Sequence, residues 1–150
     1  MEKLMQLAYE EALLAKGQDE VPVGAVLVYQ GKVIAKAHNL RNQSQSSLAH
    51  AEILVIEEGC KIQGSWRLED CDLYVTLEPC PMCAGAIIQA RIKRVFFGAY
   101  DPKGGCFGSV MDFNQIAGFN HYPEVHGGIL EKECATLLSD FFREKRQLSK

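Results

Sequence analysis

Two short clusters of residues in this chain could hold a metal ion and move protons. One is His50-Ala51-Glu52, and the other is Pro79-Cys80-Pro81-Met82-Cys83. Imidazole nitrogens and thiolates are ligands that zinc prefers in proteins, and three of them leave the fourth corner of a tetrahedron for water. This ligand count is typical of a catalytic site, so we expect one Zn²⁺ per chain, bound by His50, Cys80 and Cys83.

Glu52 lies two residues after the expected histidine ligand and could carry protons. Two thiolates and a neutral imidazole bring the net charge of a zinc site close to zero, so the metal alone acidifies water only modestly. A nearby carboxylate must then take the proton. We expect Glu52 to pass it to a ring nitrogen of the substrate and to pass the next one to the departing amine. The pattern therefore predicts hydrolytic deamination.

Other interpretations of the two clusters explain less of the pattern. A redox dithiol or a pair of buried thiols accounts for Cys-x-x-Cys but not for His-x-Glu at a second site. A structural zinc would need a fourth ligand, and the remaining cysteines form no second tight pair. These cysteines are Cys60, Cys71, Cys106 and Cys134. His38, His121 and His126 lack comparable neighbours and are expected to be ordinary surface or core histidines.

Four helices are expected, and two of them would present the clusters at their N-termini. Helical spacing of apolar residues predicts them, with Gly17 and Gly59 as stops. They run over 2–16, 49–58, 81–91 and 130–146. Cysteines three positions apart on a helix share a face, and the helix N-terminus lowers the pKa of a thiol. Both clusters would thus be placed for metal binding.

Four segments rich in strand-forming residues complete the predicted fold. They run over 24–29, 32–37, 73–77 and 94–98. The first two flank Gln30-Gly31 and predict a hairpin, whereas residues 39–47 are expected to form a loop. Because the hairpin is followed by strands that alternate with helices, the sequence predicts an α/β fold with a sheet covered on both faces.

Length and charge limit the classes of protein that the chain can represent. Its 150 residues, 47% of them hydrophobic, suit one compact domain over residues 1–150 and exclude a disordered or collagen-like chain. The net charge of −3 gives no general field that attracts nucleic acid, so such a partner must be held locally. Without a signal-peptide pattern or a long apolar run, we expect a cytoplasmic protein with reduced thiols and no membrane contact.

The chain resembles the TadA family of bacterial tRNA adenosine deaminases over nearly its whole length. His-x-Glu with Pro-Cys-x-x-Cys marks the wider deaminase superfamily, and five stretches narrow the resemblance. They are Glu20–Val26, Ala49–Ile53, Thr76–Ala86, Gly108–Asp112 and Leu137–Phe142. The resemblance implies a three-layer cytidine deaminase-like fold, in which helices flank a mixed five-stranded sheet, and it implies a homodimer.

The resemblance also implies a reaction, the conversion of the wobble adenosine to inosine in the anticodon stem-loop of an arginine tRNA. It implies the same three zinc ligands and Glu52 as the proton shuttle. An anticodon loop suits this chemistry, because an adenine must leave its stack to react and a single-stranded loop lowers that cost. The implied substrate contacts are Asn39 with the flipped base, Pro22 and Val23 with the walls of its pocket, Asp101 with the nucleotide backbone and Phe142 with the anticodon loop.

Two stretches depart from the family pattern, and two rival functions remain. Ser46-Ser47-Leu48 and Cys106-Phe107 replace residues usual in the family and could change the substrate groove. One rival is a deaminase of a free purine or nucleoside such as guanine. The other is an RNA-binding module with a purely structural zinc, which Glu52 beside an incomplete ligand set argues against. The tail Phe141–Lys150 favours RNA, with four basic residues, one acidic residue and two aromatic rings.

Overall fold

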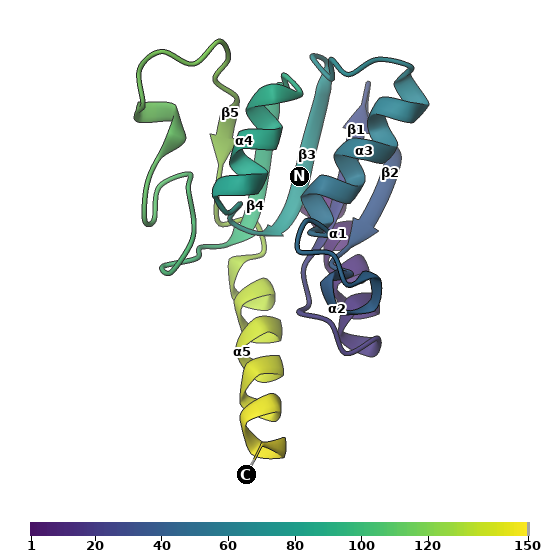
Figure 1. Cartoon of the computed structure of the whole chain (residues 1–150), viewed down its shortest axis with the longest axis vertical. Helices are drawn as coiled ribbons and strands as arrows, with labels where there is room; N and C mark the ends of the chain where they lie inside the picture. The colour runs from purple at the N-terminus through teal and green to yellow at the C-terminus, as the bar shows by residue number, and fades with distance from the viewer. Residues whose placement is uncertain (150) are drawn as a thin grey trace.

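A computed structural model describes residues 1–149, so that Lys150, the last residue of the basic tail, lies outside the described residues (Figure 1). The helices are α1 (Glu2–Gly17), α2 (Arg41–Ser44), α3 (Ala51–Gln63), α4 (Pro81–Gln89) and α5 (Glu131–Leu148), with a 3₁₀ turn at Phe113–Gln115. The strands are β1 (Gly24–Tyr29), β2 (Lys32–His38), β3 (Cys71–Leu77), β4 (Arg94–Ala99) and β5 (Glu124–His126).

All five strands belong to one mixed sheet in the order β2-β1-β3-β4-β5. β1 runs antiparallel to β2 and β3, whereas β3, β4 and β5 run parallel to one another. Parallel neighbours need a crossover connection, which α4 provides between β3 and β4. The C-terminal ends of β3 and β4 therefore meet at one edge of the sheet, and the chain leaves them through Glu78 and Tyr100.

Helices cover both faces of the sheet and make three layers. Because successive side chains of a strand point to opposite faces, each strand contributes to two cores. On one face, Met5 and Ala8 of α1 pack with Val26 of β1. On the other face, Val55 of α3 and Ile87 of α4 belong to the larger core. Figure 1 shows α3 and α4 in front of the sheet and α1 behind it. The expected mixed five-stranded sheet flanked by helices is confirmed.

The predicted end of the helix over 49–58 was wrong, because Gly59 lies within α3 rather than after it. A Cβ on Gly59 would lie less than 3.0 Å from the side chain of Leu27 in β1. The glycine therefore allows the helix to lie close to the sheet. The helix instead ends before Gly64, whose φ of +63° is the left-handed conformation that favours glycine at a helix C-terminus.

Two short elements were not predicted from the sequence pattern. α2 has 4 residues and occupies part of the segment 39–47, which was expected to be a loop. β5 has 3 residues and pairs in parallel with β4. Segments of this length contain too few residues to display a periodic pattern. Within residues 1–149 no helix is long and apolar enough to cross a membrane, and all six cysteines are free.

Candidate active site

His50 and Glu52 lie at the N-terminus of α3. His50 is the capping residue, with an extended backbone at φ −77° and ψ 151°, and its carbonyl accepts the N–H of Leu54 at 3.1 Å. Glu52 lies in the first turn and is only 4% exposed. The sequence prediction that this cluster begins a helix is confirmed.

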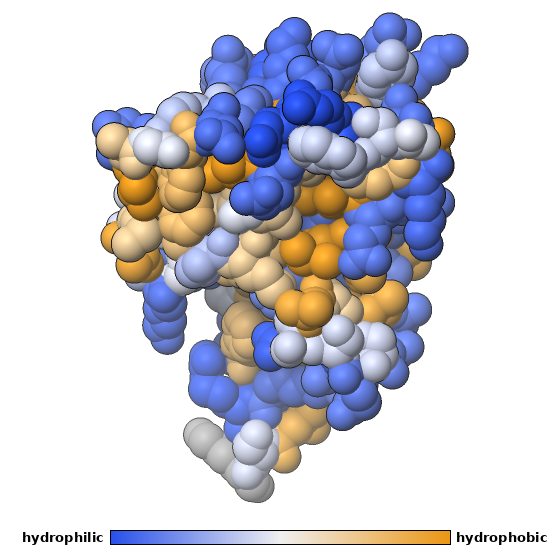
Figure 2. Space-filling view, turned by 45° about the horizontal axis from the view of Figure 1, so that its top comes forward, coloured by the Kyte–Doolittle hydropathy of each residue, from blue (hydrophilic) through white to orange (hydrophobic). Residues whose placement is uncertain are grey.

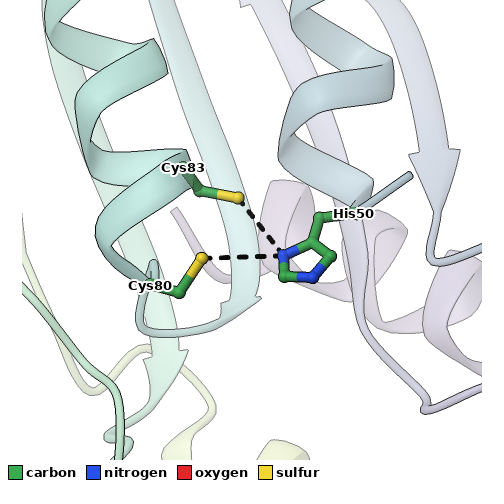
Figure 3. A group of neighbouring side chains, drawn as sticks. All are labelled: His50, Cys80 and Cys83. Carbon is green, nitrogen blue, oxygen red and sulfur yellow. Dashed lines mark hydrogen bonds between the residues drawn. The ribbon is translucent and has the colours of Figure 1, made fainter. Parts of the chain in front are cut away.

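Cys80 and Cys83 lie at the N-terminus of α4, beside the start of α3. Cys80 is the capping residue, and its carbonyl accepts the N–H of Ala84 at 2.8 Å. Pro81 occupies the first helical position, where its missing N–H would have had no helical partner. Cys83 follows within the first turn, so the two sulfur atoms point to the same side of the helix (Figure 3).

The three expected metal ligands converge on one point. His50 Nδ1 lies 3.6 Å from Cys80 Sγ and 3.5 Å from Cys83 Sγ (Figure 3). A tetrahedral zinc ion with ordinary bond lengths separates its nitrogen and sulfur ligands by about 3.6 Å. The donor set and its spacing therefore fit zinc. Within residues 1–149, no second group of three His, Cys, Asp or Glu side chains offers a comparable site.

Hydrogen bonding within the group stabilises one thiolate. The pKa of Cys80 is lowered to about 4, first because the Cys83 thiol donates to it and also because His50 donates to it. The pKa of Cys83 is raised by that same hydrogen bond and by burial. The hydrogen bond to Cys80 raises the pKa of His50 as well. The thiolate is the form in which sulfur binds a metal, so the protein prepares at least one ligand.

The carboxyl group of Glu52 has a pKa near neutrality. Burial, which disfavours the charged form, raises its pKa from 4.5 to about 7. A group with such a pKa can both accept and release a proton at neutral pH. Glu52 also lines the same cavity as His50 and Cys80, so a proton donor and acceptor faces the space in which a substrate would lie.

That cavity has a volume of about 240 Å³ and opens at the edge of the sheet where β3 and β4 end. Three parts of the chain supply its polar lining: the segment before α3, the N-termini of α3 and α4, and the loop after β4. Besides the groups described above, it is lined by Val21, Val23, Asn39, Arg41, Ala51, Leu77, Glu78, Asp101 and Phe142.

Comparison with known proteins decides the family. The family described as MafB19-like deaminase matches residues 1–146. A protein named tRNA-specific adenosine deaminase from Bacillus subtilis is 57% identical over 149 residues, which are 99% of this chain and 92% of that protein. The chain belongs to the family of tRNA-specific adenosine deaminases.

Solved structures agree with this assignment. A structure from studies of A-to-I editing by tRNA:A34 deaminases at the wobble position of transfer RNA has a TM-score of 0.88 and 48% identity, covering 91% of this deaminase and 99% of that chain. A guanine deaminase from Bacillus subtilis is less similar, with a TM-score of 0.63 and 32% identity over 77% of this deaminase and 85% of that chain. The expected cytidine deaminase-like fold is confirmed.

The deaminase fold brings together most of the residues expected to contact a substrate. Val23, Asn39, Asp101 and Phe142 line the cavity, although they are far apart in the sequence. Pro22 is buried and is not among the described residues that line it, whereas its neighbour Val21 is. The chain makes a tight turn at Pro22, where the N–H of Val23 donates to the carbonyl of Val21 at 2.8 Å.

Asn39 and Asp101 have local structural roles in the deaminase in addition to their places in the cavity. The Asn39 amide donates to the Val21 carbonyl at 3.3 Å and its oxygen accepts the N–H of Arg41 at 3.1 Å. Asp101 accepts the N–H of Lys103 at 3.0 Å. Side chains of this type commonly close turns in this way. Each retains hydrogen-bonding capacity for a ligand, since an amide has two N–H groups and a carboxylate has two oxygens.

Several residues in and around the deaminase site were not predicted from the sequence. Leu77 and Arg41 line the cavity, and so does Glu78, which directly precedes the Pro-Cys cluster. Glu20 is fully buried and accepts the N–H groups of Asn42 and Gln43 at 3.0 and 2.7 Å, at the start of α2. Glu78 stands among mostly apolar residues, a sequence signal that could have identified it as a buried carboxylate, whereas Glu20 follows the polar residues Gln18 and Asp19 and carries no such signal.

The two departures from the family pattern lie close to the metal group of this deaminase but outside the lining of the cavity. Leu48 is exposed, whereas Cys106 and Phe107 are buried. Phe107 packs edge-on against Phe113, with ring centroids 6.5 Å apart. Neither Cys106 nor Phe107 is among the described residues that line the cavity. Their bulk is therefore taken up by the interior of the loop after β4.

Proposed function

We propose that this protein converts the wobble adenosine of an arginine tRNA to inosine by zinc-assisted hydrolysis. The observation that carries the proposal is a group of two thiols and one imidazole at metal-binding distance, with the buried Glu52 beside it in a closed-in cavity. The similarity to proteins named tRNA-specific adenosine deaminase supports the choice of substrate.

His50, Cys80 and Cys83 would hold one Zn²⁺ per chain. When bound, zinc acts as a Lewis acid and makes a water molecule a better nucleophile at neutral pH. The three protein ligands leave room for a small molecule, and His50 and Cys80 line the cavity. The interior position of Cys83 keeps the opposite side of the group away from solvent.

Glu52 would move the protons of the reaction. As a carboxylate it accepts a proton from the attacking water, and as a carboxylic acid it donates that proton to a ring nitrogen of adenine. It then passes the second proton of the water to the exocyclic amine, which leaves as ammonia while the carbonyl of inosine forms. Burial assists because it holds the pKa of this carboxyl group close to neutrality.

The cavity suits a single base that has left its stack. Its volume of about 240 Å³ is below the range of about 300–1,000 Å³ for sites that bury drug-sized ligands. Asn39 would hydrogen-bond the base, and Val23 would form the apolar wall, with Pro22 supporting it from behind. Asp101 at the mouth would contact the nucleotide backbone.

Phe142 would bring α5 into contact with the anticodon loop. Phe142 is 44% exposed and lines the cavity, and its ring lies edge-on to that of Phe141. Exposed aromatic rings stack on unpaired bases, and basic residues beside them contact phosphates. The basic residues Arg143, Lys145 and Arg146 follow directly on the same helix.

A homodimer would cover an apolar surface on the loop between β4 and β5. Large apolar side chains of this loop are exposed, and apolar residues gather on the left side of Figure 2, the side on which Figure 1 places the loop. They are Val110, Met111, Ile116, Phe119 and Tyr122. Contiguous apolar surface of this kind marks interaction sites.

A tRNA substrate and six free cysteines suit a cytoplasmic location.

One parallel assay separates the proposed function from its rivals. The protein is incubated with an anticodon stem-loop of arginine tRNA, with adenosine and with guanine, and ammonia release is measured. We expect ammonia from the stem-loop alone, and none from a control stem-loop with guanosine at the wobble position. Release from guanine or adenosine would favour the free-purine or nucleoside deaminase. RNA binding without release from any substrate would favour a structural zinc module.

A further inference from the structure

Glu78 is a buried carboxylate whose two oxygens are both occupied by hydrogen bonds from one loop. The residue is 1% exposed and directly follows β3. Its Oε1 accepts the N–H of Asp101 at 3.0 Å and the hydroxyl of Ser109. Its Oε2 accepts the N–H groups of Phe107 and Ser109 at 3.0 and 3.1 Å. All four donors belong to residues 100–112, which we call the rim loop.

These hydrogen bonds distinguish Glu78 from Glu52. Two donors meet each oxygen of Glu78, so the lone pairs of its carboxyl group are already occupied by the protein. The same bonds compensate for the loss of water around a buried polar group. Glu78 therefore has the surroundings of a structural anchor, although it lines the cavity.

The rim loop needs such an anchor because it has little regular structure of its own. Between the end of β4 and Asp112 the described chain forms turns and one isolated bridge. The backbone at Gly105 approaches the carboxylate so closely that a Cβ there would lie less than 3.0 Å from it. The N–H of Cys106 also donates to the carbonyl of Pro79 at 2.9 Å. The loop is thus fastened to the segment that leads into α4.

We propose that Glu78 is a positioning residue that fixes the rim loop and thereby places Asp101 at the mouth of the cavity, where RNA is recognised. The role of the loop in RNA recognition rests on the proposed function, whereas the anchoring itself does not. Glu78 acts through backbone N–H groups of the loop, so its loss should weaken binding of the substrate more than the chemical step.

The first test is Glu78→Gln. An amide presents an NH₂ group to donors that formerly met an oxygen, so some of the four hydrogen bonds are lost. We expect faster amide hydrogen exchange in peptides covering residues 100–112 and unchanged exchange in β3 and α4. The variant should still bind about one zinc per chain. With the RNA stem-loop, KM should rise about tenfold, the effect of losing one net hydrogen bond to a charged group, and kcat should change less.

A pair of neighbouring glycines tests the anchor while Glu78 stays in place. Gly105→Ala forces a methyl group against the carboxylate and should reproduce the faster exchange and the higher KM. Gly104→Ala is the matched control, because its Cβ would meet only the carboxyl group of Asp101, at ordinary distances of 3.4 and 4.0 Å. Asp72→Asn removes a carboxylate from the other end of β3, where it binds Arg94 at 2.9 and 2.6 Å, and should leave both readouts unchanged.

The outcomes separate this inference from the proposed function. Wild-type exchange rates in the rim loop of both Glu78→Gln and Gly105→Ala would overturn the anchor, whatever the substrate is. A fall in zinc content with Glu78→Gln and no effect of Gly105→Ala would also overturn it, because Glu78 would then support the metal group. If the wild-type protein releases no ammonia from RNA, the proposed function fails, and hydrogen exchange still decides whether Glu78 holds the loop.

Discussion

At the scale of single residues, the site depends on carboxyl groups of the same type in different surroundings. Burial is the largest influence on Glu52 and raises its pKa to about 7. Glu78 and Glu20 are also buried, but backbone N–H groups donate to them, from the rim loop to Glu78 and from α2 to Glu20. These hydrogen bonds suit Glu78 and Glu20 to holding neighbouring segments in place, whereas a pKa near neutrality suits Glu52 to proton transfer.

Glu52→Gln should abolish turnover and leave the metal group intact. An amide of nearly the same shape cannot accept and release a proton at neutral pH, so the rate should fall by about 10²–10⁴-fold. Ammonia release from the RNA stem-loop measures turnover, and elemental analysis should still find about one zinc per chain. If the variant keeps wild-type turnover, Glu52 is not the proton shuttle.

Cys83→Ala should lose zinc, because two ligands hold a zinc ion far less tightly than three. Elemental analysis of the purified protein measures the metal content directly. The control is Cys60→Ala, which removes a partly exposed thiol outside the metal group and should retain about one zinc per chain. Full zinc occupancy of Cys83→Ala would contradict the ligand assignment.

At the scale of the elements, the site is built by two helix N-termini held against one sheet. α3 and α4 begin beside each other, and their packing against β1 and β3 sets the distance between the imidazole and the two sulfurs. Close packing of α3 depends on Gly59, which leaves space for Leu27. A substitution that alters this contact should therefore change the free energy of unfolding.

Gly59→Ala should destabilise the protein even though alanine is a better helix former. The added methyl group must displace the buried Leu27, at a cost of about 1–3 kcal/mol, while helix propensity returns about 1 kcal/mol. We expect a net loss of up to about 2 kcal/mol in the free energy of unfolding, measured by urea denaturation. Gly85→Ala in α4 is the control: a Cβ there has no atom within 4 Å, so this variant should be as stable as the wild type or more so.

The sequence predicted those parts of the fold and site that depend on neighbouring residues. His50 and Cys80 were expected at helix starts because capping and spacing are local properties, and the structure places them there. The middle position of Gly59 and the pairing of β5 depend on contacts with distant segments, which the pattern does not contain. The four donors to Glu78 lie 23 to 31 residues away along the chain, so only the folded structure identifies them.

At the scale of the whole molecule, binding of RNA has to be local. The chain carries a net charge of −3, and its basic tail is partly neutralised by the protein itself. Arg143 pairs with Asp140 at 2.8 Å, and Lys145 pairs with Asp19. Each pair must open or share its cation when a phosphate is bound. The C-terminal part of α5 extends beyond the sheet, as Figure 1 shows, so these side chains are accessible to an RNA that enters the cavity beside Phe142.

Replacing Arg143, Lys145 and Arg146 with serine should weaken binding of the RNA stem-loop more at low salt than at high salt. Each lost phosphate contact makes the slope of log K against log salt less steep by about 0.7–0.9, so the change should lie between one and three such steps. Filter binding or fluorescence anisotropy at several salt concentrations measures the slope. The control replaces three exposed lysines away from the cavity with serine, Lys3, Lys32 and Lys36, and changes the net charge equally. If both triple variants shift the slope alike, the tail acts only through the total charge of the protein, and α5 makes no specific contact with RNA phosphates.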